Sequence, residues 1–118
     1  MKFSSSVDVY LWLGKCDMRC SFDRLAALVR EHLKVSVIAG GVYLFFSGCR
    51  RKVKILYWDK DGYAIWHKRL EAGAFGVAQI SEQETQEMIT SSELEELLAG
   101  VDFSRIKLRK NAEKGSYN

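Results

Sequence analysis

The sequence predicts an α+β domain with a mainly antiparallel sheet of three to five strands and two helices, in the order β-α-β-β-β(-β)-α. Short β-favouring runs separated by turn residues follow one another between residues 42 and 69, and a stretch with helical spacing lies on either side of them. At 118 residues, 47% of them hydrophobic, the chain is long enough to bury a core. We expect residues 1–108 to form one globular domain and residues 109–118 to form a basic, flexible tail.

The first strand is expected at Val7–Leu13, where Val, Tyr, Leu and Trp dominate before Gly14. A loop, GKCDMRC, follows it. From Ser21, which suits a helix N-cap, apolar residues recur at helical offsets. These residues are Phe22, Leu25, Ala26, Val29 and Leu33. They predict an amphipathic helix that lies on the sheet.

Three strands in a meander are expected next, from the runs VYLFFS, KVKILYW and YAIWHKRL. In the turn DKDG we expect Lys60 and Asp61 in right-handed helical angles and Gly62 in the left-handed position, as in a three-residue hairpin loop with a bulge. That turn places Asp59 opposite Tyr63 and leaves one face of the hairpin mostly apolar. The other face would then hold these side chains together: Lys52, Lys54, Leu56, Trp58, Ala64, Trp66 and Lys68.

The last expected elements are a short strand in GAFGVAQI, residues 73–80, and a second helix. Residues 79–89, which are mostly polar, show no pattern that predicts a helix or a strand. Thr90 and Glu93 form a T-x-x-E capping box, and Ile89 and Leu94 occupy the positions of a hydrophobic staple. The apolar stripe that follows consists of Leu94, Leu97, Leu98 and Val101. It predicts a helix whose end is marked by Gly100.

Composition argues against several classes of protein. The apolar runs are far shorter than the roughly 18 residues needed to cross a bilayer, and Asp8 interrupts the N-terminal one, so a soluble, cytoplasmic protein is expected. Cys16, Cys20 and Cys49 follow no C-x-x-C spacing, which argues against a disulfide framework and a zinc site. We expect no metal, no cofactor and no membrane partner.

Charge is segregated along the chain, although the formal net charge is only +3. Residues 50–69 carry a net charge of +5, residues 79–102 carry −7 and residues 103–118 carry +4. This pattern is compatible with a polyanion site, or with internal pairing of acidic and basic faces. The candidate nucleic-acid ligands are Arg50, Arg51, Lys52, Lys54, Trp58, Lys68, Arg69, Arg105, Lys107, Arg109 and Lys110.

The two tryptophans of the hairpin have two interpretations. If Trp58 and Trp66 lie on an exposed face, they can stack on unpaired bases between the lysines. If they belong to the core, the lysine stems merely cover them while the ammonium groups stay in water. We expect Trp58, which lies beside the turn, to be the more exposed of the two.

Three blocks of the chain resemble a known family. They are DMRCSFDRLAALV, then GGVYLFFSGCRRKVKILYWDKDGYAIWHKRLEAGAF, then ITSSELEELLAGVDF. In this order, over about residues 8 to 106, they resemble the accessory protein called TnpB of bacterial insertion sequences of family 66. The family-motif positions are Asp17, Met18, Arg19, Phe22, Asp23, Trp58, Asp59, Asp61, Gly62, Lys68, Arg69 and Leu70.

The resemblance implies a small protein encoded beside a separate, larger transposase and needed for transposition. The sequence departs from the usual pattern in three places. Cys20-Ser21 replaces Lys-Gly after Arg19, Arg24 replaces a glycine, and Gly76-Val77 replaces an aromatic residue and a proline. The first departure removes a positive charge beside Arg19 and weakens the case for a phosphate site in that loop.

An enzyme is not expected. Transposase chemistry needs carboxylates that converge on divalent metal ions, whereas Asp59 and Asp61 occupy a turn in which aspartate suits the backbone geometry. We therefore expect a non-catalytic accessory protein for DNA transposition that binds DNA, at the ends of the element, through the basic hairpin and tail. The alternative is an adaptor that binds the separate transposase without direct DNA contact.

Overall fold

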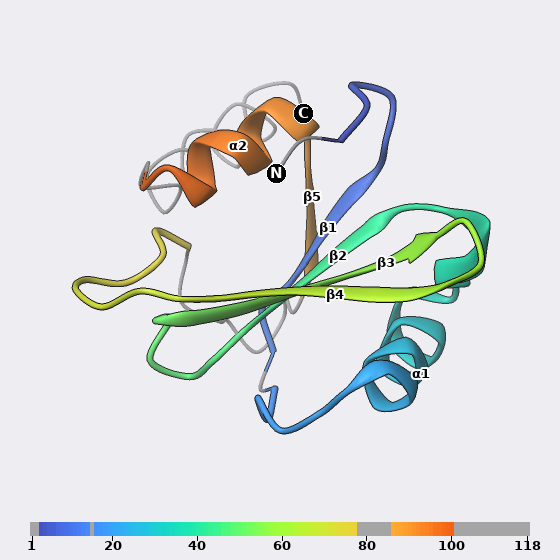
Figure 1. Ribbon diagram of the computed structural model, residues 1–118, viewed down its shortest axis with the longest axis horizontal. Helices are drawn as coiled ribbons and strands as arrows, with labels where there is room; N and C mark the ends of the chain where they lie inside the picture. Colours follow the sequence, from blue (N-terminus) through green and yellow to red (C-terminus); the bar gives the residue numbers. More distant parts are fainter. Residues whose placement is uncertain (1–2, 15, 78–85, 101–118) are drawn as a thin grey trace, which may run out of the picture.

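The computed structural model describes residues 3–14, 16–77 and 86–100. These residues form a five-stranded sheet with one helix on each face (Figure 1). The elements are β1 (Val9–Trp12), α1 (Phe22–Leu33), a short 3₁₀ helix η1 (Val37–Ala39), β2 (Val42–Phe46), β3 (Lys52–Asp59), β4 (Gly62–Arg69), β5 (Gln86–Ile89) and α2 (Ser91–Leu98). The strand order is β4-β3-β2-β1-β5. Only β1 and β2 run parallel, so the predicted α+β class with a mainly antiparallel sheet is confirmed.

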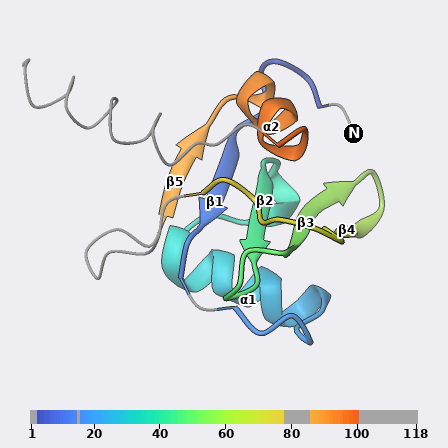
Figure 2. The same ribbon diagram turned by 90° about the vertical axis from the view of Figure 1, so that its left-hand side faces the viewer.

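The two helices cover opposite faces of the sheet (Figure 2). On the α1 face, Leu25 and Val29 of the helix pack with a cluster that includes Tyr43 and Phe45 of β2. On the α2 face, Leu94 and Leu97 belong to the cluster that holds the alternate residues of β2. Every side chain of β2 is therefore buried, which explains why its sequence is a continuous apolar run instead of an alternating one.

Local signals at the helix ends are mostly confirmed. The Thr90 hydroxyl accepts from the Glu93 main-chain N–H, and the Glu93 carboxylate accepts from the Thr90 N–H, each over 3.0 Å. Ile89 and Leu94 are both buried in the same cluster, as a staple requires. Ser21 is the N-cap of α1 but makes no side-chain capping bond, and Phe22 is 43% exposed, so that residue does not join the core as its spacing suggested.

The fifth strand lies later in the chain than the sequence indicated. Residues 73–77, the described part of GAFGVAQI, form no strand; instead Phe75 and Val77 are buried on the α2 face, and the Phe75 N–H donates to the Arg50 carbonyl. The added strand is β5, at the sheet edge, where it pairs with β1. Its sequence QEMI is largely polar, and an edge strand of this kind carries no clear apolar pattern.

The register of the β3–β4 hairpin differs from the prediction by one residue. The turn has two residues, with φ +57° at Lys60, and Asp59 pairs with Gly62 instead of Tyr63. Trp58 consequently lies opposite Tyr63 on the α1 face, whereas Trp66 lies opposite Ile55 on the α2 face. Because a helix covers each face, apolar residues occur on both sides of the hairpin, and alternation alone does not fix the register.

Candidate nucleic-acid interface

Four basic or titratable side chains meet at the open end of the β3–β4 hairpin, on its α1 face. Lys52 lies opposite Arg69, and Lys54 lies opposite His67. Directly opposed residues on one face of an antiparallel pair have Cβ atoms about 5 Å apart. His67 and Arg69 are exposed, and the two lysines are half-buried. We call Lys52, Lys54, His67 and Arg69 the basic cluster.

The pKa of His67 reflects this crowding. Partial burial lowers it from its ordinary value of 6.5, and the positive charges of Lys54 and then Lys52 lower it further. Burial and the two lysines therefore both favour the neutral form of the imidazole. His67 was not among the nucleic-acid candidates from sequence, and the expected register placed it opposite Ile55 instead of Lys54.

Lys54 also fixes the loop before α1. Its ammonium group donates to the Cys20 carbonyl over 2.6 Å. This bond joins β3 to the loop that contains the D-M-R motif, so part of the hydrogen-bonding capacity of Lys54 is already used. Met18 and Cys20 are half-buried against the cluster under α1, which holds the same loop from its apolar side.

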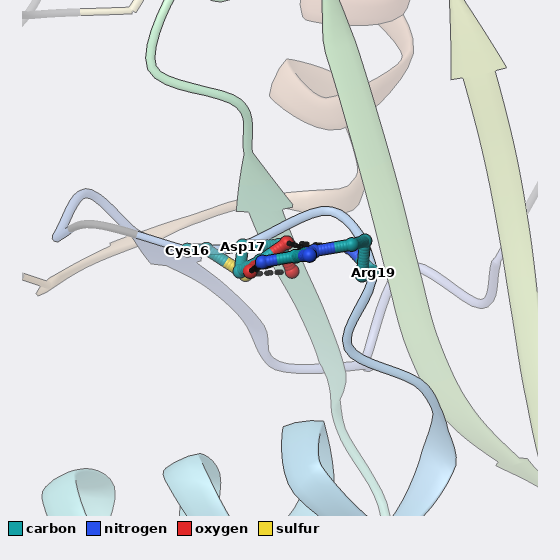
Figure 3. A network of polar contacts seen from close by, with 3 residues as sticks. All are labelled: Cys16, Asp17 and Arg19. Carbon is teal, nitrogen blue, oxygen red and sulfur yellow. Dashed lines mark hydrogen bonds and ion pairs between the residues drawn. The ribbon is translucent and has the colours of Figure 1, made fainter.

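The D-M-R motif forms a compact local ion pair (Figure 3). The Arg19 main-chain N–H donates to Asp17 Oδ1 over 2.9 Å, and its guanidinium donates to both carboxylate oxygens, the shortest contact being 2.7 Å to Oδ2. These hydrogen bonds lower the pKa of Asp17 to about 2 and raise that of Arg19. Both side chains are exposed, 92% for Arg19 and 49% for Asp17, so the pair shapes the loop without entering the core.

Arg50 is not a surface cation, and its predicted place among the exposed phosphate ligands is wrong. It is 5% exposed, and burial lowers its pKa from the ordinary value. Its guanidinium donates to the Leu13 carbonyl over 3.3 Å and to the Ser47 carbonyl over 3.4 Å, and lies 5.8 Å from the centroid of the Phe46 ring. This side chain therefore joins the ends of β1 and β2.

Glu71 bonds to Arg69 of the basic cluster and to one further arginine, Arg51. Arg51 is exposed and donates to the Glu71 carbonyl over 2.9 Å. Arg69 makes an exposed ion pair with the Glu71 carboxylate over 2.9 Å. Exposed pairs of this kind contribute little to stability, so the Arg69 guanidinium remains free to exchange this carboxylate for a phosphate.

The predicted lysine and tryptophan platform does not form, because its members lie on opposite faces of the sheet. Trp58 is half-buried on the α1 face; its Nε1–H donates to the Lys60 carbonyl over 3.2 Å, and its ring meets that of Tyr63 edge-on at 5.2 Å. Trp66 is half-buried and packs on the α2 cluster. Lys68, opposite Val53, lies on that same α2 face and is separated from Lys52 and Lys54 by the sheet.

The remaining candidates divide into three groups. Asp59 and Asp61 are exposed at the hairpin turn beside Gly62, and Asp23 is exposed in the first turn of α1. Leu70 is half-buried against the α2 cluster. Arg105, Lys107, Arg109 and Lys110 lie outside the described residues. Within the described ranges there is no group of three or more His, Cys, Asp or Glu side chains placed to hold a metal ion, and no helix has the length and apolar character to cross a membrane.

The motif residues thus lie at two places, the ion-paired loop with the first turn of α1, and the turn and open end of the β3–β4 hairpin. The family model described as IS66 Orf2-like protein matches residues 7–108. The chain belongs to this family. Membership confirms the resemblance seen in the sequence and indicates an accessory role in the transposition of an insertion sequence.

Two curated relatives come from Sinorhizobium fredii (strain NBRC 101917 / NGR234). The uncharacterized protein y4hO is 32% identical over 98 residues, which cover 83% of this chain and 84% of the relative. The uncharacterized protein y4jC is 28% identical over 91 residues, which cover 77% of this chain and 76% of the relative. No solved structure shows a significant match to this IS66 Orf2-like chain.

Proposed function

We propose that this IS66 Orf2-like protein is a non-catalytic accessory factor that contacts DNA, at the ends of its insertion sequence, through the basic cluster. The observation that carries the proposal is the cross-strand pairing of Lys52 with Arg69 and of Lys54 with His67 on one face. Side chains this close can neutralise neighbouring phosphates of one backbone. Two further groups of basic residues would extend the contact. They are Arg51, the residue just before β3, and the basic tail residues Arg105, Lys107, Arg109 and Lys110.

The contacts made by Lys54, Arg69 and Trp58 support a surface that binds the DNA backbone and does not read the bases. Lys54 already donates to the Cys20 carbonyl, and Arg69 is paired with Glu71. Trp58 is held on the α1 face by a hydrogen bond and by Tyr63, so it does not stand free as a stacking platform. We therefore assign the cluster to phosphate contacts, which position a protein on DNA without reading its sequence.

Salt dependence tests this assignment. For wild-type protein on a duplex that carries the element ends, the logarithm of affinity should fall with the logarithm of salt concentration by about 0.9 per phosphate neutralised. The double substitution Lys52→Gln with Arg69→Gln should flatten this slope by about two phosphate contacts and weaken binding at low salt. Fluorescence anisotropy of labelled duplex over a salt series measures both quantities.

A matched control removes the same charge elsewhere on the hairpin. Lys60→Gln with Lys68→Gln takes one cation from the turn and one from the α2 face, so the net charge falls equally while the basic cluster stays intact. This control should keep the wild-type slope. If both double variants flatten the slope by the same amount, binding follows net charge only. A flat salt dependence for the wild type would favour an adaptor that binds the transposase.

His67 gives the cluster a pH dependence of known sign. A bound phosphate would offset the Lys54 and Lys52 charges that lower the pKa of His67 in the free protein, so the bound state has the higher pKa. The complex then binds more protons than its free components, and affinity should rise as the pH falls from about 8 to about 5.5 at constant ionic strength. Anisotropy titrations at several pH values measure this rise.

The second histidine of the chain provides the control for this titration. His67→Gln should remove most of the rise in affinity at low pH. His32→Gln should leave it in place, since His32 lies on α1 against Trp12, with 4.8 Å between ring centroids, and is not part of the cluster. A rise that persists in His67→Gln would show that His67 is not the group whose protonation is coupled to binding.

A further inference from the structure

β4 forms one edge of the sheet, and no other described element pairs with its outer side. It has eight residues, against four in β5 at the opposite edge. Figure 2 shows β3 and β4 at the side of the sheet away from β5, with no described strand beyond them. A long edge strand presents a row of main-chain donors and acceptors to any chain able to pair with it.

The hydrogen-bonding phase of β4 is fixed by one contact. The Leu70 N–H donates to the Arg51 carbonyl over 2.7 Å, at the position that continues the β3–β4 register. Residues alternate between inward-bonding and outward-bonding positions along an antiparallel strand. Even-numbered residues of β4 therefore bond to β3. The N–H and C=O groups that point outward belong to Tyr63, Ile65, His67 and Arg69.

β4 has few of the features that usually prevent an edge strand from pairing with another chain. The chain contains no proline, and the β3–β4 register runs without a bulge from Lys52–Arg69 to Asp59–Gly62. The cations Lys68 and Arg69 stand only at the C-terminal end of β4, and the first half of the strand is neutral. Edge strands that avoid pairing more often carry a proline, a bulge or a charge in the middle.

We infer that β4 pairs with β4 of a second copy of this chain, antiparallel, about a two-fold axis at Ile65. A two-fold axis perpendicular to the sheet keeps each side chain on its own face, so outward-bonding residues must pair with each other. With Ile65 opposite itself, Tyr63 lies opposite His67 of the second copy and Ala64 lies opposite Trp66. Asp61, in the turn before the strand, then lies at the same end of the pair as Arg69 of the second copy.

Charge complementarity selects this register and this partner. The exposed carboxylate of Asp61 lies near Arg69 of the other copy at both ends of the pair, where Arg69 also bonds to Glu71 of its own chain, and the small Ala64 leaves room for the indole of Trp66. A shift by two residues in either direction would lose the opposition of Asp61 and Arg69. The self-paired edge would extend the sheet across both copies and place both basic clusters on the same face, on either side of the axis.

The mass of the protein in solution tests the inference without any assumption about DNA. Light scattering behind size-exclusion chromatography, over a range of protein concentrations, should give a dimer that dissociates on dilution. Ile65→Pro should give a monomer, because proline lacks the outward N–H, while Ile65 makes no main-chain bond to β3 that the substitution would break. Ile65→Thr keeps the N–H and the β-branched shape, so this control should stay dimeric.

Amide hydrogen exchange on the wild-type protein decides the question even if Ile65→Pro fails to fold. In the dimer the amides of Tyr63, Ile65 and His67 should be protected, and their exchange should become faster on dilution while that of Ala64 and Trp66 stays slow. A monomer at every concentration, or fast exchange of the odd-numbered amides in a dimer, would overturn the inference. A folded Ile65→Pro variant that remains dimeric would do so as well.

Discussion

Arg50→Ala is expected to lower the free energy of unfolding by about 2 to 4 kcal/mol, although it removes a cation from a basic hairpin. The guanidinium donates to the carbonyls of Leu13 and Ser47, two residues that are 1% and 8% exposed. Without it these buried acceptors lose a charged donor, and the ends of β1 and β2 lose a link. Chemical denaturation followed by circular dichroism measures the change.

The neighbouring residue is the natural control for this variant. Arg51→Ala removes the same charge one position later, but the Arg51 side chain is exposed and donates to the exposed Glu71 carbonyl instead of to buried acceptors. Its effect on stability should stay within about 0.5 kcal/mol. Equal stabilities for the two variants would mean that Arg50 contributes no more to the fold than a surface arginine.

Leu94→Ala is expected to cost about 2 to 5 kcal/mol, because it leaves a cavity where α2 meets the sheet. Leu94 is 1% exposed, belongs to the cluster on the α2 face and forms the staple with Ile89. A loss of this size shifts the melting temperature by roughly 4 °C or more per kcal/mol in a small domain. Differential scanning calorimetry at one pH and salt concentration records it.

A substitution on the outer side of the same helix separates packing from helix propensity. Glu95 is exposed on α2, so Glu95→Ala should change the melting temperature by only a small fraction of the Leu94→Ala effect. If both variants melt together with the wild type, α2 does not contribute its buried face to the cooperative unit. The comparison therefore tests whether the C-terminal helix is part of the folded domain.

Two sequence patterns that involve residues close together in the chain predicted the structure correctly. The capping box of Thr90 and Glu93 and the stripe of α1 each involve residues within three or four positions, and both are present. The register of β3 against β4 was predicted from a three-residue turn with Gly62 in the left-handed position, whereas the turn has two residues and the left-handed angle lies at Lys60, so the prediction was wrong by one residue. The position of the fifth strand was also wrong, since β5 is held by pairing with β1 from a distant part of the sequence.

The membership of the candidate site could not be predicted from the sequence. The charge of residues 50–69 pointed to the hairpin, but the one-residue shift moved Lys68 to the α2 face and brought His67 beside Lys54. The burial of Arg50 could not be read from its neighbours Cys49 and Arg51, because its acceptor on Leu13 lies far away in the chain. The tail residues from Arg105 to Lys110 lie outside the described residues, so their part in binding stays a prediction.

The position of β1 between β2 and β5 sets an order of events during synthesis of the chain. Val9 lies between Val42 on one side and Ile89 on the other, so β1, which is synthesised before both of its neighbours, receives the second of them only when β5 has emerged. The β2–β4 meander is contiguous in sequence and can form before that, at a lower entropic cost of loop closure. Until Ile89 arrives, the nascent chain carries an unpaired edge on β1, which is the interval in which a chaperone or another nascent chain can bind it.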